Sequence, residues 1–98
     1  MQTTSMPWYN RDSYERIRTL MADGERFPPD FETWNSEADR SRRARARHGE
    51  VVYRVMIDPD DFAAWCSSHK RPADDAAREE YAHQAMELLF RTGRRKSA

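Results

Sequence analysis

Few side chains in this 98-residue sequence could support chemistry, and they are scattered. Cys66 and His69 lie three positions apart and would share one helix face, where they could begin a zinc site or form a thiol–base pair. Zinc needs three or four ligands, however, and His48 and His83 have no metal-like spacing to this pair. We therefore expect Cys66 to be a small buried residue. The sequence predicts no catalytic group, metal or cofactor.

A second candidate is the acidic cluster Asp58, Asp60 and Asp61, which could hold a metal or a proton. The cluster surrounds Pro59, and an Asp-Pro pair followed by acids is typical of the first turn of a helix. Capping therefore explains these carboxylates without a site. The three glycines all stand at the ends of expected elements and cannot form a phosphate-binding loop.

The basic run at 40–48 is the most functional-looking feature. Its guanidinium groups could bind phosphate, RNA or an acidic protein, and the alternative is an ordinary solvated helix face. No aromatic residue is interleaved, so stacking on bases is not expected. We predict a partner-binding surface made of Arg40, Arg42, Arg43, Arg45 and Arg47.

Composition limits the class of protein. The chain is 38% hydrophobic and 35% charged, which predicts one small domain over residues 1–98 with a thin core. Seventeen basic and seventeen acidic residues balance, so nucleic-acid binding is possible but not favoured. One cysteine fits a reducing cytoplasm, and no signal peptide or membrane-spanning run is visible. We expect a cytoplasmic protein without a membrane partner.

Helical patterns cover most of the chain. Helices are expected from Asn10 or Asp12 to Ala22, from Asp30 to His48, from Asp58 to before Pro72, and from Ala73 to Arg91. Residues 1–7 and 94–98 are expected to be flexible tails, the second of them basic. The apolar positions predict a common core of Tyr14, Ile17, Trp34, Phe62, Trp65, Tyr81 and Leu88.

One segment interrupts the helices. It is rich in β-branched and aromatic residues and reads as a strand: Val51, Val52, Tyr53, Arg54, Val55, Met56 and Ile57. No second segment is a convincing mate, and a strand must pair its backbone groups. The sequence thus predicts a mostly helical α+β fold in the order helix-helix-strand-helix-helix, with its principal strand paired across a homodimer.

Residues 50–91, read as strand, helix, loop and helix, resemble the ribbon-helix-helix repressors. That resemblance implies dimerisation through paired strands that enter the DNA major groove. The segment 58–66, together with Tyr14-Glu15-Arg16-Ile17, looks like a set of short uncharacterised bacterial proteins, which implies a bacterial origin and no activity. The preferred expectation is a non-enzymatic accessory protein that acts through protein–protein contact as a homodimer, with an acidic protein as a possible partner. The alternative is a DNA-binding regulator of the ribbon-helix-helix type.

Overall fold

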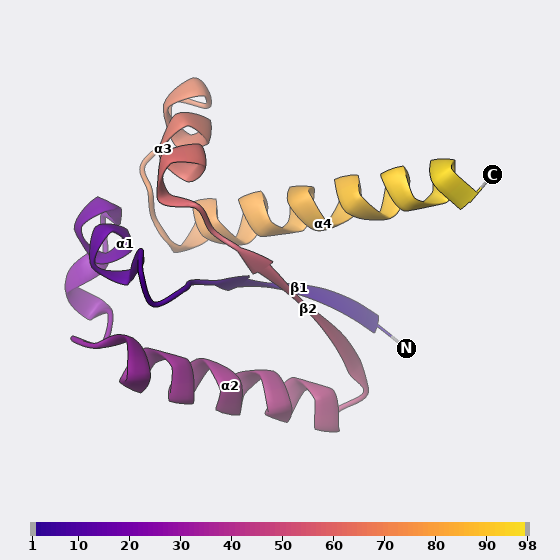
Figure 1. Cartoon of the computed structure of the whole chain (residues 1–98), viewed down its shortest axis with the longest axis horizontal. Helices are drawn as coiled ribbons and strands as arrows, with labels where there is room; N and C mark the ends of the chain where they lie inside the picture. Colours follow the sequence, from indigo (N-terminus) through magenta and orange to yellow (C-terminus); the bar gives the residue numbers. More distant parts are fainter. Residues whose placement is uncertain (1, 98) are drawn as a thin grey trace.

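The computed structural model describes the backbone of residues 2–97 and the side chains of residues 2–91. In chain order, its elements are β1 (Gln2–Trp8), α1 (Tyr14–Leu20), the 3-10 turn η1 (Gly24–Arg26), α2 (Phe31–Arg47), β2 (Glu50–Met56), α3 (Pro59–Ser68) and α4 (Asp75–Ser97). The fold is α+β, as expected, but it begins with a strand (Figure 1). The predicted element order is therefore wrong.

The prediction failed because the strand expected at 51–57 has a partner strand within the chain. β1 and β2 form a two-stranded parallel sheet, in register from Gln2 beside Glu50 to Trp8 beside Met56. Beyond the ladder, the Ile57 amide donates to the Trp8 carbonyl at 2.8 Å. The partner of the predicted strand is thus the segment that we expected to be an N-terminal tail. The prediction of a single strand paired across a dimer is wrong.

The sequence of β1 fits an edge strand once its mate is known. The Trp8 carbonyl points toward β2, and strand residues turn their backbone groups to alternate sides, so Pro7 turns its nitrogen toward the outer edge. A proline there removes no hydrogen bond from the ladder and blunts an open edge. Met6 and Trp8 are buried, which ties β1 to the body of the protein.

Two long helices cover the sheet. Figure 1 shows the paired strands running between α2 and α4. On the α2 side, the Trp8 ring lies edge-on to Trp34, with centroids 5.1 Å apart. On the α4 side, Val55 packs against Ala82 and Met86. Each face of this parallel sheet is therefore covered in part by a helix, as parallel sheets favour, and Val51 and Met56 of β2 stay exposed.

The main core lies at one end of the molecule, where α1, η1, α3 and the first turns of α2 and α4 meet. Its largest fully buried side chains are Tyr14, Ile17, Ile57 and Phe62. Three further predicted core residues, Trp34, Trp65 and Tyr81, are partly buried and pack against it. The Tyr14 hydroxyl also donates to the Pro28 carbonyl at 2.6 Å.

Leu88 does not belong to that core. It is 61% exposed, because α4 has passed the aromatic cluster by this point. α4 also continues to Ser97, through Gly93 and beyond the expected end at Arg91. Of the expected C-terminal tail at 94–98, residue 98 and all of the side chains lie outside the described residues.

A buried ion pair anchors the start of α4. Arg78 is 6% exposed and donates two hydrogen bonds to Asp23, at 2.7 and 2.9 Å. Its guanidinium also lies over the Phe27 ring, 5.0 Å from the centroid. The hydrogen bonds from Arg78 hold the pKa of Asp23 below its usual range. This ion pair joins α4 to the segment between α1 and α2, although Asp23 and Arg78 are far apart in the sequence.

Candidate functional site

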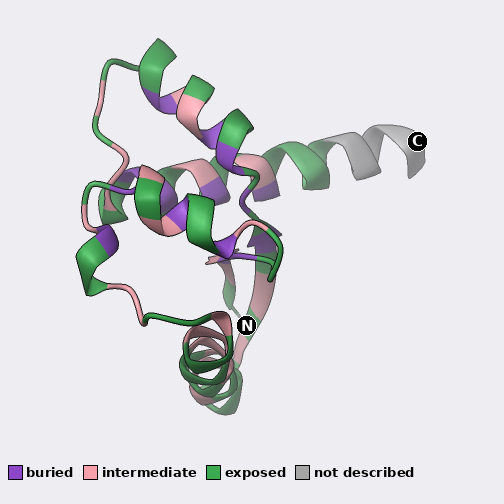
Figure 2. Cartoon of the chain, turned by 60° about the vertical axis from the view of Figure 1, so that its left-hand side comes forward, coloured by how far each residue is buried: buried purple, intermediate pink, exposed green. Residues whose placement is uncertain are grey.

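The predicted basic surface lies on the second half of α2. Asp30 caps the helix by accepting a hydrogen bond from the Thr33 amide at 2.7 Å, and Phe31 and Trp34 pack it against the core. No residue of α2 is fully buried, and its ribbon in Figure 2 alternates between exposed and half-buried. The beginning of α2 is therefore docked on the core, and its later turns expose one side, which carries Arg40, Arg43 and Arg47.

The structure divides the five arginines rather than gathering them. Arg42 donates to Asp39 at 3.0 and 2.6 Å, and Arg43 lies 2.7 Å from the other Asp39 oxygen. The hydrogen bonds from Arg42 lower the pKa of the Asp39 carboxyl. Asp39 therefore stays ionised and neutralises part of the basic run.

Three of the arginines share one side of α2. Arg40, Arg43 and Arg47 line a shallow hollow of about 310 Å³ with Ser36 and Asp39. We call these three side chains the arginine face. Their spacing of three and four residues places them on one stripe of the helix, and Arg40 and Arg47 are exposed. The arginine face is the part of the predicted surface whose side chains line one hollow.

Arg45 lies elsewhere. It lines a groove between α2 and α4, together with Glu37 on α2 and the acidic residues Asp75 and Glu79 on α4. Its charge is therefore opposed by local carboxylates. The floor of this groove is aromatic and includes Tyr9, and burial raises the pKa of that phenol strongly.

The predicted dimer strand is largely used within the chain. Val55 and Ile57 are buried, and the Tyr53 ring lies edge-on to Phe90 of α4 at 5.6 Å. Val51 and Met56 remain 46% and 53% exposed. Since β1 occupies one edge of β2, the segment is mainly part of this chain's own core.

An apolar surface that we did not predict lies along α4. Leu88, Leu89 and Phe90 are 61%, 52% and 39% exposed, and we call them the apolar end of α4. Leu88 also lines an open hollow of about 230 Å³ between α3 and α4, whose other lining residues are Trp65, Tyr81, Gln84 and Ala85. The signal in the sequence was the Leu-Leu-Phe run directly before the basic C-terminal segment.

The pair Cys66 and His69 does not form a site. Cys66 is buried among core residues, and burial raises the pKa of its thiol. His69 is exposed at the end of α3, where its ring lies against Trp65 with centroids 4.3 Å apart. A protonated, buried thiol is a poor nucleophile and a poor metal ligand.

The acidic cluster at the start of α3 has local partners. Asp58 accepts a hydrogen bond from the Asp61 amide at 2.9 Å, as a helix cap does, and Asp60 forms an ion pair with Arg16 of α1. Among the described residues, no group of three or more His, Cys, Asp or Glu side chains is arranged to hold a metal ion. Capping and ion pairing account for these carboxylates.

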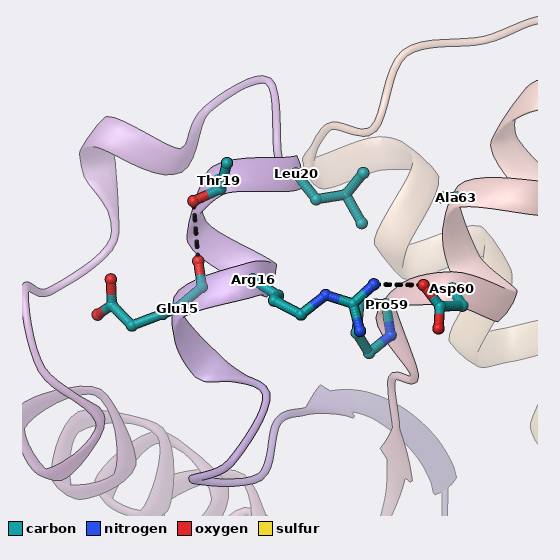
Figure 3. Close-up of a pocket in the computed structure, with 7 residues that line it drawn as sticks. All are labelled: Glu15, Arg16, Thr19, Leu20, Pro59, Asp60 and Ala63. Carbon is teal, nitrogen blue, oxygen red and sulfur yellow. Dashed lines mark hydrogen bonds and ion pairs between the residues drawn. The ribbon is translucent and has the colours of Figure 1, made fainter.

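A further hollow, of about 410 Å³, lies between α1 and α3. Figure 3 shows the Arg16–Asp60 ion pair bridging it, with Leu20 pointing into the space. The remaining lining residues are Glu15, Thr19, Pro59 and Ala63. The Thr19 hydroxyl already donates to the Glu15 carbonyl at 3.0 Å, so this lining brings no base and nucleophile together.

The chain matches no protein-family model, and no curated protein or solved structure is significantly similar to it. No helix within the described residues is long and apolar enough to cross a membrane. The geometry of the surfaces above is therefore the basis for a functional hypothesis.

Proposed function

We propose that this protein is a non-enzymatic accessory protein of the cytoplasm, which self-associates and uses the arginine face to bind an acidic segment of another protein. The observation that carries the proposal is the arginine face itself. Three arginines line one hollow on the exposed half of α2, and the only carboxylate in that lining is Asp39. Asp39 already pairs with Arg42 and Arg43.

The composition of the arginine face favours carboxylates as its ligands. Guanidinium groups bind carboxylates in a bidentate manner, and arginine is the preferred residue for such contacts at interfaces. Arg40 and Arg47 are exposed at the two ends of the hollow, so an extended acidic segment could reach both. The ligand of this surface is then a run of Asp or Glu residues.

Nucleic acid is the weaker candidate for the same surface. The chain has no net charge, and the start of α4 carries Asp75 and Glu79 on the groove beside α2. These acids would repel a phosphate backbone that extended past the arginine face. No aromatic side chain lines the hollow for base stacking.

The experiment compares two variants that each lose two positive charges. R40Q/R47Q removes the ends of the arginine face, whereas R26Q/K70Q removes two exposed charges elsewhere. Binding of a labelled oligoglutamate peptide and of a random-sequence DNA duplex would be measured by fluorescence anisotropy. We expect R40Q/R47Q to weaken peptide binding about fivefold and R26Q/K70Q to leave it unchanged.

The outcome also separates the two ligand classes. Tighter binding of DNA than of the peptide, lost in R40Q/R47Q, would favour the nucleic-acid alternative. Equal peptide affinity in both variants would show that the arginine face is an ordinary solvated surface.

A further inference from the structure

The groove between α2 and α4, a hollow of about 320 Å³, is bordered by carboxylates that the described part of the chain leaves largely unpaired. Glu37 and Glu79 are exposed, and neither carboxylate forms an ion pair or a hydrogen bond with any described residue. Asp75 lies 3.3 Å from Arg78, and its side chain is 80% exposed. Unlike the acids at the start of α3, Glu37 and Glu79 have no partner among the described residues. The groove therefore offers negative charge to a ligand.

Tyr9 brings a hydrogen-bond acceptor to the floor of the groove. It lines the groove although only 4% of the residue is exposed. Its hydroxyl forms no hydrogen bond with any described residue, whereas the equally buried Tyr14 donates to the Pro28 carbonyl. A buried phenol normally has a partner, and its oxygen can accept a hydrogen bond from an N–H donor. The contrast between the two tyrosines indicates that the Tyr9 hydroxyl is available to a ligand in the groove.

The aromatic part of the floor suits a cation. Phe27 and Trp34 line the groove with Tyr9, and the Tyr9 and Trp34 ring centroids are 4.8 Å apart. The face of an aromatic ring attracts cations. The chain itself places one here, since the Arg78 guanidinium lies 5.0 Å from the centroid of Phe27. Carboxylates, ring faces and a phenol oxygen all favour the same kind of ligand, which is a cation that carries N–H donors.

The arginines of the groove do not neutralise its lining. Arg78 is already engaged by Asp23 through two hydrogen bonds. Arg45 also lines the groove, but it forms no ion pair with any described residue. The three carboxylates of the lining therefore outnumber the one arginine that is not otherwise paired. A cation that enters the groove is attracted by these carboxylates and repelled by Arg45.

We propose that the groove between α2 and α4 binds a small organic ammonium ion. The ammonium group lies between the carboxylates of Glu37 and Glu79, and the hydrocarbon part rests on the aromatic floor. The volume of the hollow is at the lower end of the range for small-molecule sites, which suits a ligand of few carbon atoms. The site shares no residue with the lining of the arginine face and does not depend on the proposed function.

The first test compares three probes of similar shape and different charge, which are n-butylammonium, n-butanol and butyrate. Heteronuclear NMR would follow the indole N–H signals of Trp34, which lines the groove, and of Trp65, which lines the hollow between α3 and α4. We expect n-butylammonium to shift the Trp34 signal in a saturable manner and to leave the Trp65 signal unchanged. The two other probes should bind at least about fivefold more weakly. Butanol or butyrate binding as tightly as n-butylammonium would overturn the proposal.

The second test changes the charge of the groove in both directions. Glu79→Gln should weaken n-butylammonium binding about threefold, and Arg45→Gln should strengthen it about threefold, because the first change removes an attractive charge and the second a repulsive one. The matched control is Glu25→Gln, which removes an exposed carboxylate beside a different hollow and should leave the affinity unchanged. Circular dichroism would confirm that all three variants are folded. Weaker binding by Arg45→Gln, or equal affinities for Glu79→Gln and Glu25→Gln, would contradict a cation site.

A third probe identifies the source of the ammonium group. Nα-acetyl-lysine methylamide carries the same group on a blocked peptide unit. Tighter binding of this compound than of n-butylammonium would assign the groove to a lysine side chain of another protein. Weaker binding would assign it to a free amine.

The groove and the arginine face can be tested independently of each other. Glu79→Gln should keep the wild-type affinity for oligoglutamate, and R40Q/R47Q should keep the wild-type affinity for n-butylammonium. Loss of both activities in either variant would show that the two surfaces are not separate sites and would overturn the assignment of the groove.

Discussion

The two ends of this molecule differ in how they use their aromatic and charged residues. At one end, aromatic rings from β1, α1, α2, α3 and α4 pack together, and Arg78 is buried against Asp23. At the other end, α2 presents arginines and α4 presents Leu88 and Leu89, with a small cluster around Val55 between the helices. The radius of gyration of 14.3 Å, slightly above the roughly 13 Å of a typical 100-residue domain, agrees with this partly open shape. The comparison teaches that the packing that stabilises the fold lies at one end of the two helices, whereas the surface that we propose for association lies at the other.

The largest expected effect is on the free energy of unfolding, in a comparison of alanine variants of two phenylalanines. Phe62 is 0% exposed, whereas Phe90 is 39% exposed. Phe62→Ala should destabilise the fold by about 3–5 kcal/mol, because it leaves a cavity in the main core. Phe90→Ala should cost about 1 kcal/mol, measured by urea unfolding at a concentration where both variants are monomeric. Equal costs would show that the two ends are packed alike.

The buried ion pair should give the next largest effect. Asp23→Asn leaves the buried Arg78 charge with only the longer contact to Asp75, at 3.3 Å, and should cost about 2–3 kcal/mol at neutral pH. The pKa of Asp23 is lower in the folded protein than in the unfolded chain, where it is about 4. The stabilisation that ionised Asp23 gives the folded state is therefore fully present above the unfolded pKa. It is lost as the pH falls through the lower pKa of the folded state. Unfolding of wild type and variant at neutral and acid pH would measure this, and their stabilities should converge in acid. A difference that persists unchanged in acid would contradict the electrostatic explanation.

A smaller effect tests the register of the sheet. By alternation from Trp8, the Thr4 amide faces β2 and the Ser5 amide faces the outer edge of β1. Thr4→Pro should therefore be about 2 kcal/mol more destabilising than Ser5→Pro. Thermal unfolding of both variants would check this order. The reverse order would place the hydrogen-bonding edge on the wrong side of β1.

The smallest effect concerns the surface assigned to association. R40Q/R47Q should change the free energy of unfolding by less than about 0.5 kcal/mol, because neither side chain is part of a packed cluster. Chemical denaturation of the monomer would measure it. A decrease in the free energy of unfolding as large as that of Asp23→Asn would mean that the arginine face stabilises the fold instead of binding a partner.

The helix starts of α2 and α3 were predictable because their signals are local. Asp30 and Asp58 each accept the expected capping hydrogen bond, and Pro59 stands in the first turn of α3. The strand expected at 51–57 is observed at Glu50–Met56, a shift of one residue. In each case a few neighbouring residues determine the conformation.

β1 and the Asp23–Arg78 pair could not be predicted in this way. Residues 2–5 are all polar, and Pro7 follows two positions later. The strand conformation of this segment therefore comes from its pairing with β2 and from the burial of Met6 and Trp8. Asp23 and Arg78 meet only when α4 packs against the turn after α1. The division of the arginines depends likewise on where Asp39 and the α4 carboxylates lie.

Parallel pairing of β1 with β2 has a consequence for the order in which the chain can assemble. Two parallel strands cannot be joined by a tight hairpin turn. Here Gln2 pairs with Glu50, and α1 and α2 lie between the two strands in the sequence. During synthesis, β1 leaves the ribosome before β2 and can pair with it only after the two intervening helices have been translated. Trp8 and Tyr9 thus remain without their native surroundings throughout that interval.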